Sequence, residues 1–189
     1  MGFEKMISGM YLRMTIESDI FGPLSSRLVK RFILTTPLVA KMHEDDSPDL
    51  KEVAHILKKT FGISEAPLKV RKLVVRICDV VTRRGARLAA AGIVGILKKI
   101  GRDGTGGITS GQGGRSDIKM RRTVVAIEGG LYTSYRMFRD YLHEAFNELL
   151  GEEVAQHVIL KATEDGSGIG AALLATSYSS CIVDRVHQP

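Results

Sequence analysis

The chain has 189 residues, of which 44% are hydrophobic and 25% are charged, and its formal net charge is +6. This length and composition allow one domain with a substantial core. No apolar run reaches the roughly 18 residues that a membrane-spanning helix needs. The excess of Lys and Arg is compatible with nucleic-acid binding, but it is more simply explained by solvated helix faces.

The cysteine and histidine content argues against a disulfide framework and against a zinc site. Cys78 and Cys181 are the only cysteines, and neither has a second cysteine at CxxC spacing. The five histidines are scattered along the chain. We therefore expect a reducing, cytoplasmic compartment, two free thiols and no bound metal.

The first part of the chain alternates between helix-like and turn-like segments. A helix is predicted from Phe3 to about Met14, followed by a polar segment that extends to Arg27. Residues 32–36 are predicted to be extended, because Pro37 disfavours helical geometry at the preceding Thr36.

Two further helices are predicted before residue 101. The first is capped by Ser47, has Pro48 at its first position and ends at Gly62. The second begins after Pro67 and extends to about Ile100, and its later, Ala- and Gly-rich half is predicted to pack most closely. Its predicted buried stripe consists of Leu73, Ile77, Val80, Val81 and Leu88. Its predicted exposed basic stripe consists of Lys69, Lys72, Arg76, Arg83 and Arg87.

The second part repeats the order strand, glycine-rich turn, helix. Residues 101–122 contain seven glycines and are predicted to form a flexible surface loop within the same domain. The predicted strands are 122–128 and 157–161, and the predicted helices that follow them are 135–150 and 171–177. This pattern predicts an α/β fold with helices packed on a small sheet.

Each predicted strand is followed by a glycine-rich turn, "EGGLY" at 128–132 and "EDGSGIG" at 164–170. Taken alone, either turn can be a plain connection, with Asp165 and Ser167 closing the second one. Two such turns on consecutive strands are expected at one edge of a sheet, where α/β proteins bind ligands. Neither turn is a Walker motif or a dinucleotide-binding fingerprint.

Five segments, in this order along the chain, resemble the C-terminal part of eukaryotic hexokinases. Their amino-acid sequences are most similar to those of plant hexokinases. These segments cover almost the whole chain. They read "FEKMISGMYL", "LTTPLVAKMHEDDSPDL", "VRKLVVRICDVVTRRGARLAAAGIVGILKKIGRDG", "RRTVVAIEGGLYTSYRMFRDYLHEAF" and "EDGSGIGAALLATS". The resemblance implies part of an actin-like ATPase (ribonuclease H-like) large lobe, residues 1–189, and a kinase that uses ATP with Mg to phosphorylate glucose or another hexose at the 6-hydroxyl.

The resemblance also implies roles for individual residues. It makes Glu4 of "FEKM" a sugar contact and places Gly9 and Thr36 near ATP. Gly129 and Gly130 match the adenosine-side loop, where Gly130 stands in place of a more usual serine. Without the resemblance, Glu4 beside Lys5 reads as a charge pair on a solvated helix face.

Other parts of a hexokinase have no match in this chain. Neither an Asp-Gly-Gly-Thr nor an Asp-x-x-Gly-Thr phosphate loop occurs, and the family's catalytic Asp lies in the segment that carries the second loop. "GMYL" also passes through "RMTI" directly into "ESDIFGP", so about two or three helical turns of the family are absent after Leu12. We therefore expect no catalytic residue in this chain, a missing N-terminal lobe or a full-length homologue as partner, and no activity of the chain alone.

The alternative interpretation is a non-catalytic regulatory or interaction module that uses the basic helix. A nucleic-acid-binding surface would interleave aromatic side chains with its basic residues. The segment from Lys69 to Arg87 contains no aromatic residue, so we expect no nucleic-acid partner.

Overall fold

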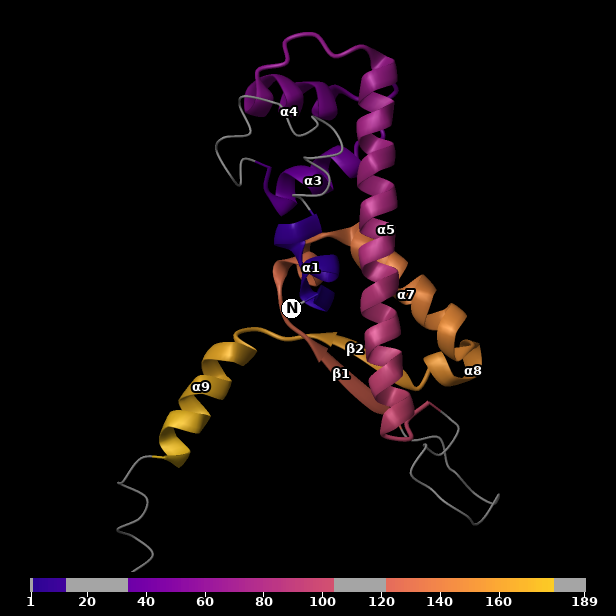
Figure 1. The fold of residues 1–189 in the computed structure, drawn as a ribbon, viewed down its shortest axis with the longest axis vertical. Coiled ribbons are helices and arrows are strands. Elements are labelled where there is room, and N and C mark those ends of the chain that lie inside the picture. Colours follow the sequence, from indigo (N-terminus) through magenta and orange to yellow (C-terminus); the bar gives the residue numbers. More distant parts are fainter. Residues whose placement is uncertain (1, 13–33, 104–121, 179–189) are drawn as a thin grey trace, which may run out of the picture.

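The computed structural model describes residues 2–12, 34–103 and 122–178. Within these residues the chain is mostly helical, with one small sheet (Figure 1). The elements are α1 (Gly2–Ile7), α3 (Thr36–His43), α4 (Lys51–Phe61), α5 (Leu68–Lys99), β1 (Thr123–Ile127), α6 (Gly130–Ser134), α7 (Arg136–Leu150), α8 (Glu152–Ala155), β2 (Val158–Ala162) and α9 (Gly166–Ser177). The predicted fold class, helices packed on a small sheet, is confirmed.

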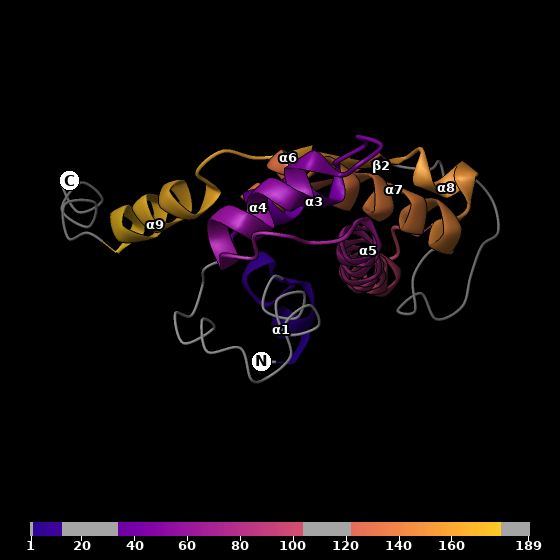
Figure 2. The ribbon, with the colours of Figure 1, turned by 90° about the horizontal axis from the view of Figure 1, so that it is seen from above.

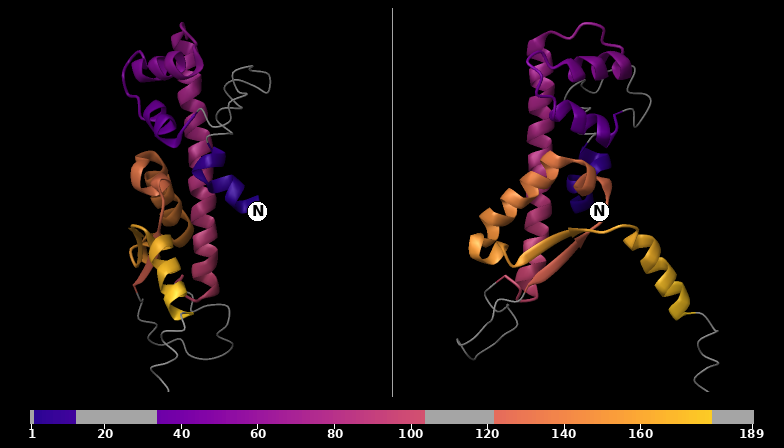
Figure 3. Two further views of the ribbon diagram at one scale, coloured as in Figure 1. Left: turned by 90° about the vertical axis from the view of Figure 1, so that its left-hand side faces the viewer. Right: turned by 180° about the vertical axis from the view of Figure 1, so that it is seen from behind.

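Helix α5 is the longest element, and four other helices, α1, α3, α4 and α7, pack against it. Helix α7 packs along its later half, α3 and α4 pack beside its first half, and α1 lies on a different side from α7 and the strands (Figures 2 and 3). The core lies between these helices, and its fully buried side chains include Met42, Leu57 and Leu142. No helix in the described part of the chain is both long enough and apolar enough to cross a membrane.

The small residues of α5 lie where other segments approach closely. Ala86 and Ala90 are fully buried. A Cβ atom at Gly85 would lie 2.9 Å from the side chain of Leu12, and one at Gly92 would lie 2.7 Å from the ring of Phe3. The N-terminal segment therefore packs on glycines of α5, as the Ala- and Gly-rich sequence predicts for this half of the helix.

The buried stripe of α5 differs in part from the prediction. Val81 is buried as predicted, but Leu73 is 58% exposed and Val80 is 51% exposed. The buried positions in this region are instead Val74 and Cys78, which directly follow Leu73 and Ile77 in the sequence, so the buried stripe is rotated around the helix axis relative to the prediction. Periodicity identifies an apolar face, but the packing of α3 and α7 decides which part of that face is covered.

Several predicted element boundaries are also wrong. Thr36 begins α3 and is not extended, because Pro37 occupies the first turn, where its missing N–H costs nothing. Helix α4 begins at Lys51, after Leu50 in the left-handed region (φ 51°), and not at Pro48. Ser47 still contributes, since its hydroxyl oxygen accepts a hydrogen bond from the amide of Lys51.

Two helices of the predicted set have different extents from those expected. Helix α1 ends at Ile7, and Ser8 separates it from a further helical turn at 9–12. Helix α9 begins at Gly166, so three glycines of the second predicted turn belong to its first turns. The predicted surface loop at 101–122 lies, apart from its ends, outside the described residues and stays a prediction.

Candidate functional site

Both glycine-rich turns lie at the same edge of the sheet, as their order in the sequence predicts. Strands β1 and β2 are parallel neighbours, and Ile127 at the end of β1 pairs with Ala162 at the end of β2. The amide of Thr163 donates to the carbonyl oxygen of Ile127 (3.0 Å) and extends this pairing by one residue. The segments that follow the two strands therefore leave the sheet side by side.

The Gly129–Gly130 turn presents bare backbone on an open surface. Gly129 has φ 118° and ψ 149°, a conformation that glycine adopts without strain, and its carbonyl oxygen accepts bonds that begin α6. Gly130 has no such backbone requirement. A Cβ atom at either glycine would meet no described atom within 4 Å. Packing within the described chain therefore does not explain a glycine at position 130.

The other residues expected at the nucleotide lie close to this turn. A Cβ atom at Gly9 would lie 3.1 Å from Oγ1 of Thr36 and 3.7 Å from Cδ1 of Leu131. Leu131 directly follows Gly130. The structure therefore brings together the turn after α1, the first residue of α3 and the start of α6, which are distant in sequence.

Glu4 lies on the exposed surface of α1. Its backbone carbonyl accepts from the amide of Ser8 (2.9 Å), but its carboxylate forms no hydrogen bond or ion pair with the other described residues. A charge pair between Glu4 and Lys5 is therefore not what the described structure contains.

A carboxylate also joins the two turns, which the sequence did not indicate. Oε2 of Glu128 accepts from the amide of Ser167 (3.1 Å) and from its hydroxyl group (2.9 Å). Ser167 thus does more than close its own turn, because it connects α9 to the end of β1. No sequence pattern identifies this pair, which is 39 residues apart.

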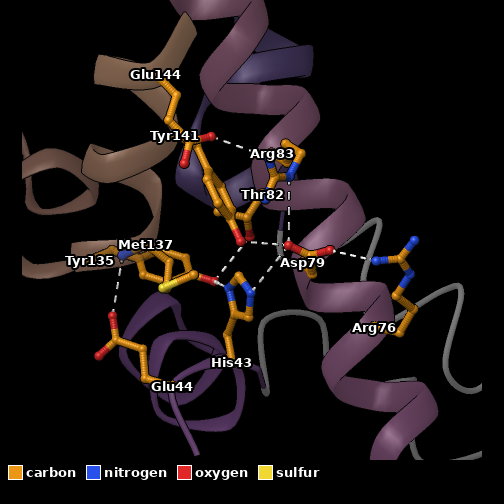
Figure 4. A network of polar contacts seen from close by, with 10 residues as sticks. All are labelled: His43, Glu44, Arg76, Asp79, Thr82, Arg83, Tyr135, Met137, Tyr141 and Glu144. Carbon is orange, nitrogen blue, oxygen red and sulfur yellow. Dashed lines mark hydrogen bonds and ion pairs between the residues drawn. The ribbon is translucent and has the colours of Figure 1, made fainter.

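A buried polar network joins α3, α5 and α7 (Figure 4). The hydroxyl of Tyr135, where α6 meets α7, lies 2.7 Å from Nδ1 of His43 and 3.0 Å from Oγ1 of Thr82. Tyr141 donates to Oδ1 of Asp79 (2.5 Å), and Nε2 of His43 lies 3.7 Å from the same oxygen. Every buried side-chain nitrogen or oxygen in the described residues has a hydrogen-bond partner.

Burial shifts the pKa values of this network. Desolvation lowers the pKa of His43 below its usual value of 6.5, and the nearby Asp79 carboxylate offsets this only in part. Burial and the hydrogen bond to Asp79 raise the pKa of Tyr141 to about 12. Burial also raises the pKa of Tyr135. At neutral pH the network therefore contains a neutral imidazole and two neutral phenols, which suits a structural connection more than proton transfer.

The basic stripe of α5 is exposed, as predicted, but part of it is paired with α7. Arg83 forms an ion pair with Glu144 (3.2 Å), and Arg87 forms one with Glu148 (2.6 Å). The two pairs are four residues apart on both helices, so they follow one side of the helix–helix contact. Arg76 is paired within α5. These pairs neutralise much of the stripe and weaken the case for nucleic-acid binding.

The comparisons with known proteins agree with this architecture. The sequence model of the hexokinase family matches residues 1–177. Hexokinase-3 of Arabidopsis thaliana is 64% identical over 95% of this chain and 38% of that protein, and Hexokinase-3 of Oryza sativa subsp. japonica is 61% identical over 95% of this chain and 37% of that protein. A structure described as a hexokinase from Schistosoma mansoni complexed with glucose is 27% identical and covers 93% of this chain and 37% of that chain, with a TM-score of 0.66.

These matches identify the fold as part of the actin-like ATPase fold of sugar kinases. The chain belongs to the hexokinase family. It spans a little over a third of the length of the relatives it matches.

Proposed function

We propose that this chain forms the adenosine side of an ATP site in a hexokinase-type kinase, which transfers phosphate from ATP to the 6-hydroxyl of glucose or another hexose. The observation that carries the proposal is the convergence of Gly9, Thr36 and the Gly129–Gly130 turn at one open edge of the sheet. The similar chain from Schistosoma mansoni, described as complexed with glucose, supports a hexose as the sugar.

The residues present fit the nucleoside of ATP better than its phosphates. Bare backbone at Gly129 and Gly130 allows a flat adenine or ribose to approach closely. The first turn of α9 is bonded instead to the Glu128 carboxylate and lies beside Asp165. A phosphate group placed there would meet two negative charges. Among the described residues, no three His, Cys, Asp or Glu side chains are grouped so that they could hold a metal ion.

We further propose that Glu4 is a sugar contact that is too weak to bind a hexose by itself. One or two hydrogen bonds to a charged acceptor contribute about 1–3 kcal/mol. A millimolar site corresponds to about 4.1 kcal/mol. Substantial hexose affinity therefore requires side chains beyond Glu4.

The chain alone is proposed to lack phosphoryl transfer, because it carries neither phosphate-loop sequence and no group assigned as the base that takes the sugar proton. A coupled assay for glucose 6-phosphate with the purified chain tests this directly. No product above a protein-free control is expected, and turnover that increases with chain concentration would contradict the proposal.

Nucleotide binding is tested with a matched pair of glycine variants. Gly130 and Gly95 are both helical, and a Cβ atom at either position would meet no described atom within 4 Å. Gly130→Val is expected to weaken ATP binding, measured by saturation-transfer NMR, because the side chain covers the bare backbone. Gly95→Val is expected to leave ATP binding unchanged. Equal effects of the two variants, or no binding by the wild-type chain, would refute the proposed site.

A further inference from the structure

The two glycine-rich turns are connected by one carboxylate oxygen. Glu128 is the first residue after β1, and its Oε2 accepts two hydrogen bonds from Ser167, one from the amide (3.1 Å) and one from the hydroxyl (2.9 Å). Among the described residues, these are the hydrogen bonds that join α9 to another element of the fold. We call this arrangement the Glu128–Ser167 clasp.

The first turn of α9 is shaped to receive this carboxylate. A Cβ atom at Gly166 would lie 3.1 Å from Oε2 of Glu128 and only slightly farther from its carboxyl carbon. A side chain at position 166 would therefore push the carboxylate away from Ser167. A Cβ atom at Gly168 would lie 2.7 Å from Oδ2 of Asp165, so a side chain there would displace the exposed Asp165 carboxylate. Asp165 itself adopts φ 50°, so the chain turns sharply just before α9.

The clasp matters because little else fixes the direction of α9. No residue of α9 is buried, and Leu173 and Leu174 are 66% and 63% exposed. The helix extends away from the rest of the described structure (Figures 1 and 3). A carboxylate near a helix N-terminus is favoured by the free N–H groups there, and a bond to a charged acceptor is stronger than one between neutral groups.

We propose that Glu128 is a positioning residue that fixes the first turn of α9 onto the Gly129–Gly130 turn. The consequence for ligands rests on the proposed nucleotide function. The carboxylate of Glu128 fills the end of α9, so the nucleoside, and not the phosphates, contacts this pair of turns. Loss of the clasp releases α9 and widens the cradle that bare backbone forms at Gly129 and Gly130.

The experiment compares substitutions of the clasp with a control in the same turn. Glu128→Ala removes the acceptor of both hydrogen bonds, whereas Ser167→Ala removes only the hydroxyl donor and keeps the amide donor. The double variant completes a cycle that measures the coupling between the carboxylate and the hydroxyl. Glu128→Asp keeps the charge and serves as the conservative rescue. Glu164→Gln is the matched control, because Glu164 is an exposed carboxylate in the same turn with no bond to another described residue.

The first readout is amide hydrogen exchange at Ser167 and the following residues of α9, measured without nucleotide. Glu128→Ala is expected to accelerate exchange there by roughly three- to tenfold, as the loss of one net hydrogen bond allows. Ser167→Ala should increase the exchange rate only slightly when Glu128 is already alanine. Exchange in Glu128→Asp should be slower than in Glu128→Ala, and Glu164→Gln should leave the exchange rates of α9 unchanged. Unchanged exchange in Glu128→Ala, or additive effects of the two alanine variants, would overturn the positioning role.

The second readout is the affinity for adenosine and for ATP, measured by saturation-transfer NMR. Glu128→Ala should weaken both ligands by a similar factor, since both present the same nucleoside. Tighter ATP binding with unchanged adenosine binding would show that the end of α9 receives phosphate, which would overturn the ligand assignment. If the wild-type chain binds neither ligand, the proposed nucleotide function and the ligand assignment both fail, while the exchange data still decide whether Glu128 positions α9.

Discussion

Removal of a single buried hydroxyl tests the polar network that joins α3, α5 and α7. Tyr135 is 1% exposed, and its hydroxyl bonds with both His43 and Thr82. Tyr135→Phe keeps the ring but leaves two buried polar groups without this partner. Each lost bond contributes about 0.5–1.5 kcal/mol, and an unsatisfied buried group costs about 1–3 kcal/mol. We therefore expect the free energy of unfolding to fall by about 2–3 kcal/mol.

Urea unfolding followed by far-UV circular dichroism measures this loss. With a slope of about 1–3 kcal/mol per molar urea, the midpoint should fall by roughly 1 M. Tyr178→Phe is the control, because Tyr178 is 88% exposed, and its midpoint should match that of the wild-type chain. A loss below about 0.5 kcal/mol in Tyr135→Phe, at an unchanged slope, would refute the assignment of the hydroxyl as the centre of the network.

Three further predictions concern the described core. The pKa of His43 is lowered in the folded state, so the unfolded chain binds the proton more readily, and the free energy of unfolding should decline as pH falls through 6.5. If His43→Gln leaves the dependence of the free energy of unfolding on pH unchanged, His43 is not its origin. Gly95→Ala should raise the free energy of unfolding by about 0.5–1 kcal/mol, whereas Gly85→Ala should lower it because its Cβ would lie 2.9 Å from Leu12. Equal urea midpoints of the two variants would contradict this. Burial raises the pKa of Cys78 to about 12, so in a Cys181→Ser background Ellman's reagent should label the chain only after unfolding, and rapid native labelling would refute that burial.

The sequence predicted the parts of the fold that depend on local signals. Glycines and prolines mark the ends of α4 and α7 and the start of α5, and the order strand, turn, helix predicted the position of both turns at one sheet edge. Once two neighbouring strands are parallel, the segments that follow them must leave the sheet at the same edge. The extent of α5 was also predicted closely, since 32 residues without a strong helix breaker continue as one helix.

The remaining features depend on contacts between distant residues. Periodicity could not show that Val80 is exposed, because that outcome depends on where α7 lies. The Glu128–Ser167 clasp and the contacts of Tyr135 join residues 39 to 92 positions apart, and single-sequence patterns carry no signal for such pairs. The proximity of Gly9 to Thr36 was implied only by the family resemblance.

Chemical-shift mapping of ATP on the isotopically labelled chain tests the central claim most directly. The shifted amide signals are expected to belong to residues around Gly9, Thr36 and Gly129–Leu131, with smaller changes at Ser167, and Gly130→Val is expected to weaken these shifts. Shifts confined to the basic stripe from Lys69 to Arg87, lost at high salt, would contradict the proposed site and indicate nonspecific binding of an anion.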